Sequence, residues 1–308
     1  MTVFTALYRG TQQVLSMKRV VLIFFLPNLL LALMMILPVA ALINGSLSQS
    51  LFGRRLMSRF EVFWIEDFIY QRGDALVSLL PLWLAGGVLY LLIDLFLTGG
   101  ALGVFNAAEP FTIRRFWSQT YNHFSILLRL LLLSLPSYAL VLAVYVVVTN
   151  SLTGDLSRTS PSERPRVLID WALYAVLFFF LSLVNVCFDY ARVKSVADRR
   201  GGAFRESWSA LKFVMRNKLK SLSLYYTLLL LQVIVTLLGI YVVGLLPQTS
   251  LLLVALVFLA QELFVLLRIA VRLVSYSSET ALYHSLSGKA ESVARESVVF
   301  PEEAVSTV

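Results

Sequence analysis

The sequence alternates long runs of apolar residues with shorter polar segments. Six runs contain few charged residues, at positions 20–43, 76–98, 124–149, 168–190, 221–246 and 251–274. A helix needs about 20 residues to cross roughly 30 Å of hydrocarbon, so each run is long enough to span a bilayer. The pattern therefore predicts an all-α fold, a polytopic transmembrane bundle of six helices, within one domain over residues 1–290.

A second pattern precedes the first, third and fifth runs. Aromatic and aliphatic residues recur there at helical spacing with basic residues between them, and superposing the three segments aligns Tyr8, Trp117 and Trp208. This pattern is typical of amphipathic helices that lie in the headgroup region of a membrane. We therefore expect three hairpin repeats, each formed by a cytoplasmic amphipathic helix, a span out and a span back, around an axis along the membrane normal.

The segment between the first two runs is also aromatic. From Leu51 to Tyr70, apolar residues gather on one side of a predicted helix, among them Phe60, Phe63, Trp64 and Phe68. Such a stripe suits anchoring in the outer leaflet, and its aromatic density equally suits a surface for a protein partner. The two interpretations stay open at this point.

Composition and charge agree with a membrane protein and give its orientation. Hydrophobic residues make up 58% of the chain and charged residues 14%, against about 25% charged in ordinary soluble domains. With the N-terminus inside, 19 of the 26 lysine and arginine residues fall on the inner side. This asymmetry predicts a multi-pass protein of the cell inner membrane with both termini in the cytoplasm.

The charge distribution also bears on partners and on the tail. The net charge of +8 is explained by topology and by attraction to anionic lipids at the cytoplasmic face, so nucleic acid binding is not needed to explain it. Residues 291–308 are rich in glutamate and lack the apolar density to pack, which predicts a mobile cytoplasmic tail.

Catalytic and metal-binding motifs are not recognisable in the sequence. The only cysteine is Cys187, and with the two histidines, His123 and His284, it cannot form the usual ligand sets of zinc. The sequence has no phosphate-binding Walker loop, no nucleophile elbow and no His-Glu-x-x-His helix. We therefore expect no metal, no cofactor and no enzymatic activity.

The polar residues inside the apolar runs are the candidate functional residues. They are Asp94, Arg129, Asn185, Gln232, Glu262 and Arg268. Counted from the cytoplasmic end of each run at 1.5 Å per residue, four of them lie about 6 to 9 Å deep, whereas Gln232 and Glu262 lie about 16 to 18 Å deep. We expect Asp94 to pair with Arg129 or Arg268, and Glu262 to form a hydrogen bond with Gln232.

Two interpretations of these groups remain. Polar side chains in membrane bundles often satisfy one another and fix helix register. Alternatively, a carboxylate near the bilayer centre can belong to a pathway for protons, ions or lipid headgroups.

Aromatic amphipathic helices alternate with hydrophobic hairpins in Phe111–Leu133 and Tyr190–Leu224. This arrangement resembles bacterial six-span membrane proteins of uncharacterised function, and distantly the membrane domain of some glycerophosphodiester phosphodiesterases. The resemblance covers most of the chain and implies an architecture. It implies no phosphodiesterase activity, because the catalytic domain of those enzymes is not in this sequence.

These features together favour a non-catalytic accessory or scaffold subunit of a larger inner-membrane complex. Its expected partners are membrane lipids and other membrane protein subunits. The alternative is a transporter or permease-like component that uses Glu262 within the membrane.

Overall fold

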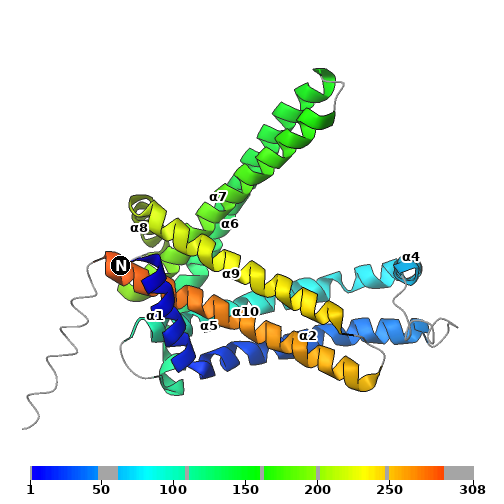
Figure 1. Cartoon of the computed structure of the whole chain (residues 1–308), viewed down its shortest axis with the longest axis horizontal. Helices are drawn as coiled ribbons and strands as arrows, with labels where there is room; N and C mark the ends of the chain where they lie inside the picture. Colours follow the sequence, from blue (N-terminus) through cyan, green and yellow to red (C-terminus); the bar gives the residue numbers. More distant parts are fainter. Residues whose placement is uncertain are drawn as a thin grey trace, which may run out of the picture. The chain divides into compact units, whose positions relative to one another are not determined.

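The computed structural model describes residues 2–47, 62–107, 111–159, 163–198, 202–246 and 250–287. Nine α-helices occupy these ranges, and no strand occurs in them. The helices are α1 (Val3–Ser16), α2 (Lys18–Leu47), α4 (Val62–Ser78), α5 (Leu80–Phe105), α6 (Ile113–Thr159), α7 (Glu163–Asp198), α8 (Ala203–Arg216), α9 (Lys218–Leu245) and α10 (Leu251–Leu286) (Figure 1).

Six helices are long and apolar enough to cross a membrane. They are α2, α5, α6, α7, α9 and α10, and their most apolar windows have mean hydropathies from 2.0 to 2.8. The predicted all-helical fold with six transmembrane helices is confirmed, and the chain is a multi-pass membrane protein by this pattern.

The second helix of each hairpin continues beyond the apolar run that identified it. Helix α5 extends to Phe105, α7 to Asp198 and α10 to Leu286, whereas the runs end at residues 98, 190 and 274. Most side chains in these extensions are buried, including those of Leu102 and Leu282. The extensions of α7 and α10 carry more serine, threonine and charged residues than their runs, which lowers their hydropathy. The extension of α5 carries none of these residues and contains three glycines instead.

The helices cluster into two compact units, which we describe separately. The first contains the described parts of Met1–Leu15, Thr98–Leu229 and Val274–Val308, and the second those of Ser16–Leu97 and Leu230–Leu273. The predicted single domain over residues 1–290 stays a prediction. The predicted mobile tail, residues 291–308, lies outside the described residues.

In the first unit, short helical segments pack against the extensions of the long helices. Helix α1 lies on the end of α10, where an added Cβ at Gly10 would be 2.8 Å from the backbone nitrogen of Ser278. The start of α6 lies on the end of α5, where a Cβ at Gly100 would be 2.8 Å from the Phe116 ring. Helix α8 packs against α7 and α6 (Figure 1). Small residues permit this close approach of helix backbones.

Helices α1 and α8 bury the same stripe of positions. Ala6, Gly10 and Val14 are buried in α1, and Glu206, Ala210 and Val214 are buried in α8. The predicted aromatic positions lie on the opposite, exposed sides, with exposed fractions of 63% for Tyr8, 46% for Trp117 and 55% for Trp208. Exposure of amphipathic rings beside long apolar helices fits the interfacial placement expected of them.

The segment around Trp117 differs from the other two, because no break separates it from the span that follows. Helix α8 ends where the Asn217 backbone and side-chain amide groups both donate to the Phe213 carbonyl, at 3.0 and 3.2 Å. The aligned residue in α6 is Ile126, and the helix runs without a break from Ile113 to Thr159.

In the second unit, α5 packs on α2 and α9 packs on α10. A Cβ at Gly86 would lie 2.9 Å from the Met35 methyl carbon, and a Cβ at Gly239 would lie 3.0 Å from Cγ of Phe264. Glycines thus bring both helix pairs close together.

The outer aromatic segment is only partly described. Phe60 lies outside the described residues, and the side chains of Phe63 and Trp64, which belong to α4, are likewise not described. Phe68 is half-buried in the same helix. The choice between a lipid anchor and a partner surface for these residues stays a prediction.

Substitution of Gly10 by alanine tests the packing of α1. We expect a loss of about 1 to 3 kcal/mol in the free energy of unfolding, because the new methyl group overlaps the Ser278 backbone. The measurement is reversible unfolding in detergent micelles, with Gly87→Ala as the control, since a Cβ at Gly87 would meet nothing within 4 Å. Equal stability of the two variants would contradict the packing described for α1.

Candidate functional site

A salt bridge joins two membrane-spanning helices of the second unit. Arg272 on α10 donates from Nη1 to Oδ1 of Asp94 on α5 and from Nη2 to Oδ2, both at 2.7 Å. This is the bidentate geometry in which a guanidinium group binds a carboxylate most strongly. The Asp94 side chain is 16% exposed and that of Arg272 is 41% exposed.

This partner differs from the one we expected. We expected Asp94 to pair with Arg129 or Arg268, but in the structure it pairs with Arg272. Arg272 lies one helical turn beyond Arg268, on the same side of α10. The prediction therefore chose the correct side of the helix but a position one turn too early. The error follows from the depth estimate, which placed the end of the last span at residue 274 although α10 continues to Leu286.

The two arginines that we expected as partners lie elsewhere. Arg268 lines an apolar cavity of about 230 Å³ between α9 and α10. Arg129 is exposed on α6 between the buried residues Leu127 and Leu130. A long arginine side chain at this position can extend along the helix so that its charge reaches the headgroup region.

Asn185 is the centre of a hydrogen-bonded cluster in the first unit. Its Oδ1 accepts a hydrogen bond from the Tyr138 hydroxyl at 3.1 Å, and its Nδ2 donates to the Tyr225 hydroxyl at 3.1 Å. The cluster therefore connects α7 to α6 and α9. A side-chain amide can satisfy two neighbours at once, which explains why one asparagine is placed in an apolar span.

Gln232 and Glu262 do not form the expected pair. Among the described residues there is no hydrogen bond between them, and both are half-buried. Helices α9 and α10 touch where Gly239 approaches Phe264. Because the two helices are antiparallel, the residue two before Phe264, Glu262, lies level with the residue two after Gly239, Tyr241. Gln232 is nine residues from Tyr241, or roughly 14 Å along the axis at 1.5 Å per residue.

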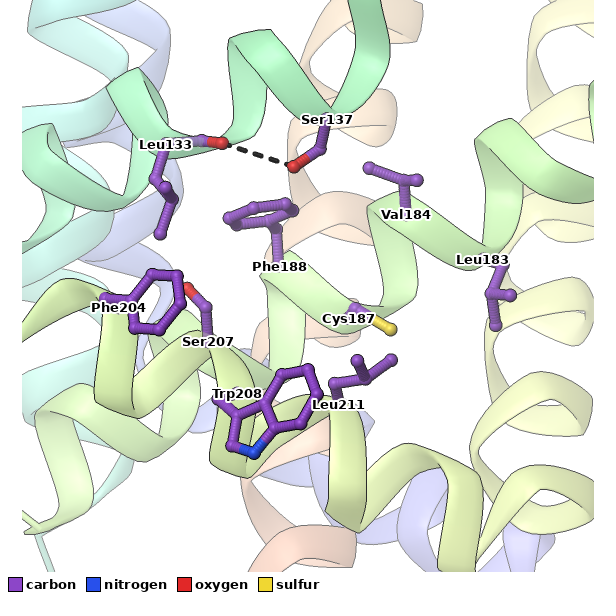
Figure 2. Close-up of a pocket in the computed structure, with 10 residues that line it drawn as sticks. All are labelled: Leu133, Ser137, Leu183, Val184, Cys187, Phe188, Phe204, Ser207, Trp208 and Leu211. Carbon is purple, nitrogen blue, oxygen red and sulfur yellow. Dashed lines mark hydrogen bonds between the residues drawn. The ribbon is translucent and has the colours of Figure 1, made fainter. Parts of the chain in front are cut away.

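A cavity of about 270 Å³ lies between α6, α7 and α8 in the first unit. Figure 2 shows the Phe204, Trp208 and Leu211 side chains of α8 on one side of it. Phe188 and Val184 of α7, with Leu133 of α6, form much of the rest. Trp208 thus has a further role that the sequence did not predict.

The extensions of the long helices carry polar contacts that we did not predict from the sequence. Gln13 on α1 donates to the Phe105 carbonyl at 3.1 Å and accepts from the Ser277 hydroxyl at 2.6 Å. Lys194 on α7 lies 3.6 Å from the buried carboxylate of Glu206 on α8. Buried and polar residues continue to alternate at helical spacing after each apolar run ends. This spacing could have predicted that the helices extend beyond the runs.

Two further contacts belong to this set. The Tyr283 hydroxyl donates to Asp198 at 3.2 Å, and Nε2 of His284 lies 2.6 Å from Oδ1 of Asn106. The first contact connects the end of α10 to the last residue of α7, and the second connects it to the turn that follows α5.

The part of the chain that the structure describes contains no group of three or more His, Cys, Asp or Glu residues able to hold a metal ion. Two of the predicted polar residues join helices: Asp94 contacts Arg272 of a second helix, and Asn185 contacts tyrosines of two others. Such contacts are typical of helix association in membrane bundles.

Comparisons of this chain with protein-family models, curated proteins and solved structures find no match. The resemblance to bacterial six-span proteins and to the phosphodiesterase membrane domain therefore stays a prediction.

A double-mutant cycle on Asp94 and Arg272 tests the salt bridge. We expect Asp94→Asn and Arg272→Gln to be non-additive, with a coupling energy of about 1 kcal/mol, toward the lower part of the usual range because Arg272 is partly exposed. The measurement is unfolding of the single and double variants in detergent. The control is a second cycle that combines Asp94→Asn with Arg268→Gln. We expect the coupling energy of this pair to be near zero. Equal coupling in both cycles would contradict the pairing.

Proposed function

We propose that this protein is a non-catalytic accessory or scaffold subunit of a larger inner-membrane complex, with both termini in the cytoplasm. The observation that carries the proposal is the exposure of its membrane-spanning helices. Only 6% of the most apolar window of α6 and 11% of that of α7 is buried within the chain. Large apolar side chains along these helices are therefore available to lipid and to helices of other subunits.

The exposed side chains of the α6 and α7 hairpin are suited to a protein partner in composition. They include Trp171, Tyr174 and Phe179, with exposed fractions of 70%, 58% and 45%. Aromatic residues are enriched at protein interfaces, because each contributes a large apolar area from a fairly rigid side chain.

The polar residues support the same proposal. Asp94 and Asn185 are engaged in contacts between helices, which is what a structural role requires. The carrier alternative depends on Glu262, which is half-buried and has no hydrogen bond or ion pair among the described residues. Glu262 lines neither the cavity between α6, α7 and α8 nor the cavity between α9 and α10, which favours the scaffold proposal.

The proposal includes the three hairpin repeats and their shared orientation. It is supported by the matching buried positions of α1 and α8, and by the extension of α5, α7 and α10 beyond their apolar runs. Parallel repeats would give all three amphipathic helices one membrane face, as the positions of the basic residues predict.

The experiment is purification of the full-length protein in mild detergent, followed by native mass determination and site-specific photocrosslinking. With a photoreactive phenylalanine analogue at Phe179, we expect crosslinks to a second subunit present at fixed stoichiometry. The same analogue at Phe188, which is 7% exposed, is the control and should give no such crosslink.

The variant Glu262→Gln separates the two candidate functions. A scaffold should assemble with its partner as the wild type does, because a neutral group of similar size replaces the carboxyl group. Recovery of the chain alone, together with an ion-coupled or proton-coupled flux in liposomes that Glu262→Gln abolishes, would reject the scaffold proposal in favour of a carrier.

A further inference from the structure

We propose that the cavity between α6, α7 and α8 binds one acyl chain of an anionic phospholipid from the surrounding bilayer, with the lipid phosphate beside Lys212 and Arg205. This inference does not depend on the proposed scaffold role. A carrier or a scaffold could hold such a lipid equally well.

The lining of the cavity suits a hydrocarbon chain. Its walls are formed mainly by leucine, valine, phenylalanine and tryptophan side chains, and no charged residue lines it (Figure 2). The hydroxyl group of Ser137 donates to the Leu133 carbonyl at 3.3 Å, so it is directed to the backbone. An ion or a polar solute would find few partners on these walls, whereas methylene groups would fit them.

The size of the cavity agrees with a chain rather than a whole lipid. Its volume of about 270 Å³ is just below the roughly 300 to 1,000 Å³ of pockets that enclose a drug-sized ligand. The headgroup must then lie outside the cavity, against whatever side chains border it.

Helix α8 places three kinds of residue on three of its sides. Glu206, Ala210 and Val214 are buried against the rest of the unit. Phe204, Ser207, Trp208 and Leu211 line the cavity. Arg205, Lys212 and Arg216 form an exposed basic stripe, which helical spacing of 3.6 residues per turn places next to the cavity side.

Lys212 connects the basic stripe to the cavity. Its ammonium nitrogen lies 5.6 Å from the centre of the Trp208 ring, and Trp208 is one of the lining residues. A cation held over a ring that borders an apolar cavity is placed where the phosphate of a lipid would lie if its chain filled the cavity.

The charge of α8 selects an anionic lipid over a zwitterionic one. Glu206 is the one acidic residue of the helix, and it is buried beside Lys194. The exposed charges of α8 are therefore all positive, and each lysine or arginine near an anionic headgroup strengthens binding by about fivefold.

A second apolar cavity provides a control within the same hairpin. It has a volume of about 340 Å³ and lies between α6 and α7, where Val144 and Phe180 are among its lining residues. None of its lining residues is basic. It can contact hydrocarbon, but it offers no charge with which to recognise a headgroup.

The experiment is native mass spectrometry of the full-length protein in detergent, with phosphatidylglycerol or phosphatidylcholine of identical acyl chains added. We expect one phosphatidylglycerol retained per chain, bound about tenfold or more tightly than phosphatidylcholine. Val184→Trp fills the cavity and should abolish this retention, whereas Val144→Trp, which fills the second cavity, should not.

A pair of charge variants keeps the test decisive if Val184→Trp does not fold. Arg205→Gln with Lys212→Gln changes only exposed side chains, and it should remove the preference for phosphatidylglycerol. Lys18→Gln with Arg19→Gln removes equal charge at the start of α2, where both side chains are exposed, and should leave the preference unchanged.

Three outcomes would overturn the proposal. The first is equal retention of the two lipids by the wild type, and the second is an unchanged preference in the Arg205 and Lys212 variant. The third is co-purification of a polypeptide that protects the cavity from lipid, which would identify a protein as its occupant.

Discussion

Helices surrounded by hydrocarbon gain little from the hydrophobic effect when they meet, so close packing of small residues has to hold them together. In this protein, Gly10 brings α1 onto the backbone of α10, and Gly100 brings the end of α5 onto the start of α6. These contacts lie where the long helices continue beyond their apolar runs. The packed core of the first unit lies at one end of α6 and α7. The remaining length of these two apolar helices therefore exposes its side chains.

The polar residues follow from the same constraint. A charge inside an apolar helix is costly unless it is paired, and Asp94 is paired by both nitrogens of the Arg272 guanidinium group. Asn185 joins three helices through two tyrosine hydroxyls. Both arrangements fix which helices are neighbours and at what register. This is the structural role that we favour over a transport pathway.

The sequence predicted the spanning helices correctly, because twenty consecutive apolar residues leave little alternative. It also identified Asp94 and Asn185 as residues needing partners. It could not identify Arg272 as the partner of Asp94, because the estimate of depth took the end of the apolar run as the end of the helix. The same error paired Glu262 with Gln232, although the contact of Gly239 with Phe264 sets a different register.

The cavity beside Trp208 could not be predicted either, since it is formed by three helices whose packing depends on contacts distant in sequence. Helical spacing alone gave Trp208 an interfacial position, which agrees with its exposure. The additional information came from tertiary structure, in the packing of α8 against α6 and α7.

Docking of α1 on the extension of α10 closes the packed core of the first unit. It can be tested by cysteine crosslinking between Gln13→Cys and Ser277→Cys, in a chain with Cys187→Ala, by a short bifunctional thiol reagent in native membranes. We expect efficient crosslinking of this pair, whose native side chains are 2.6 Å apart, and little crosslinking between Ser277→Cys and the exposed control Tyr8→Cys. No crosslink between positions 13 and 277, or equal crosslinking of both pairs, would contradict it.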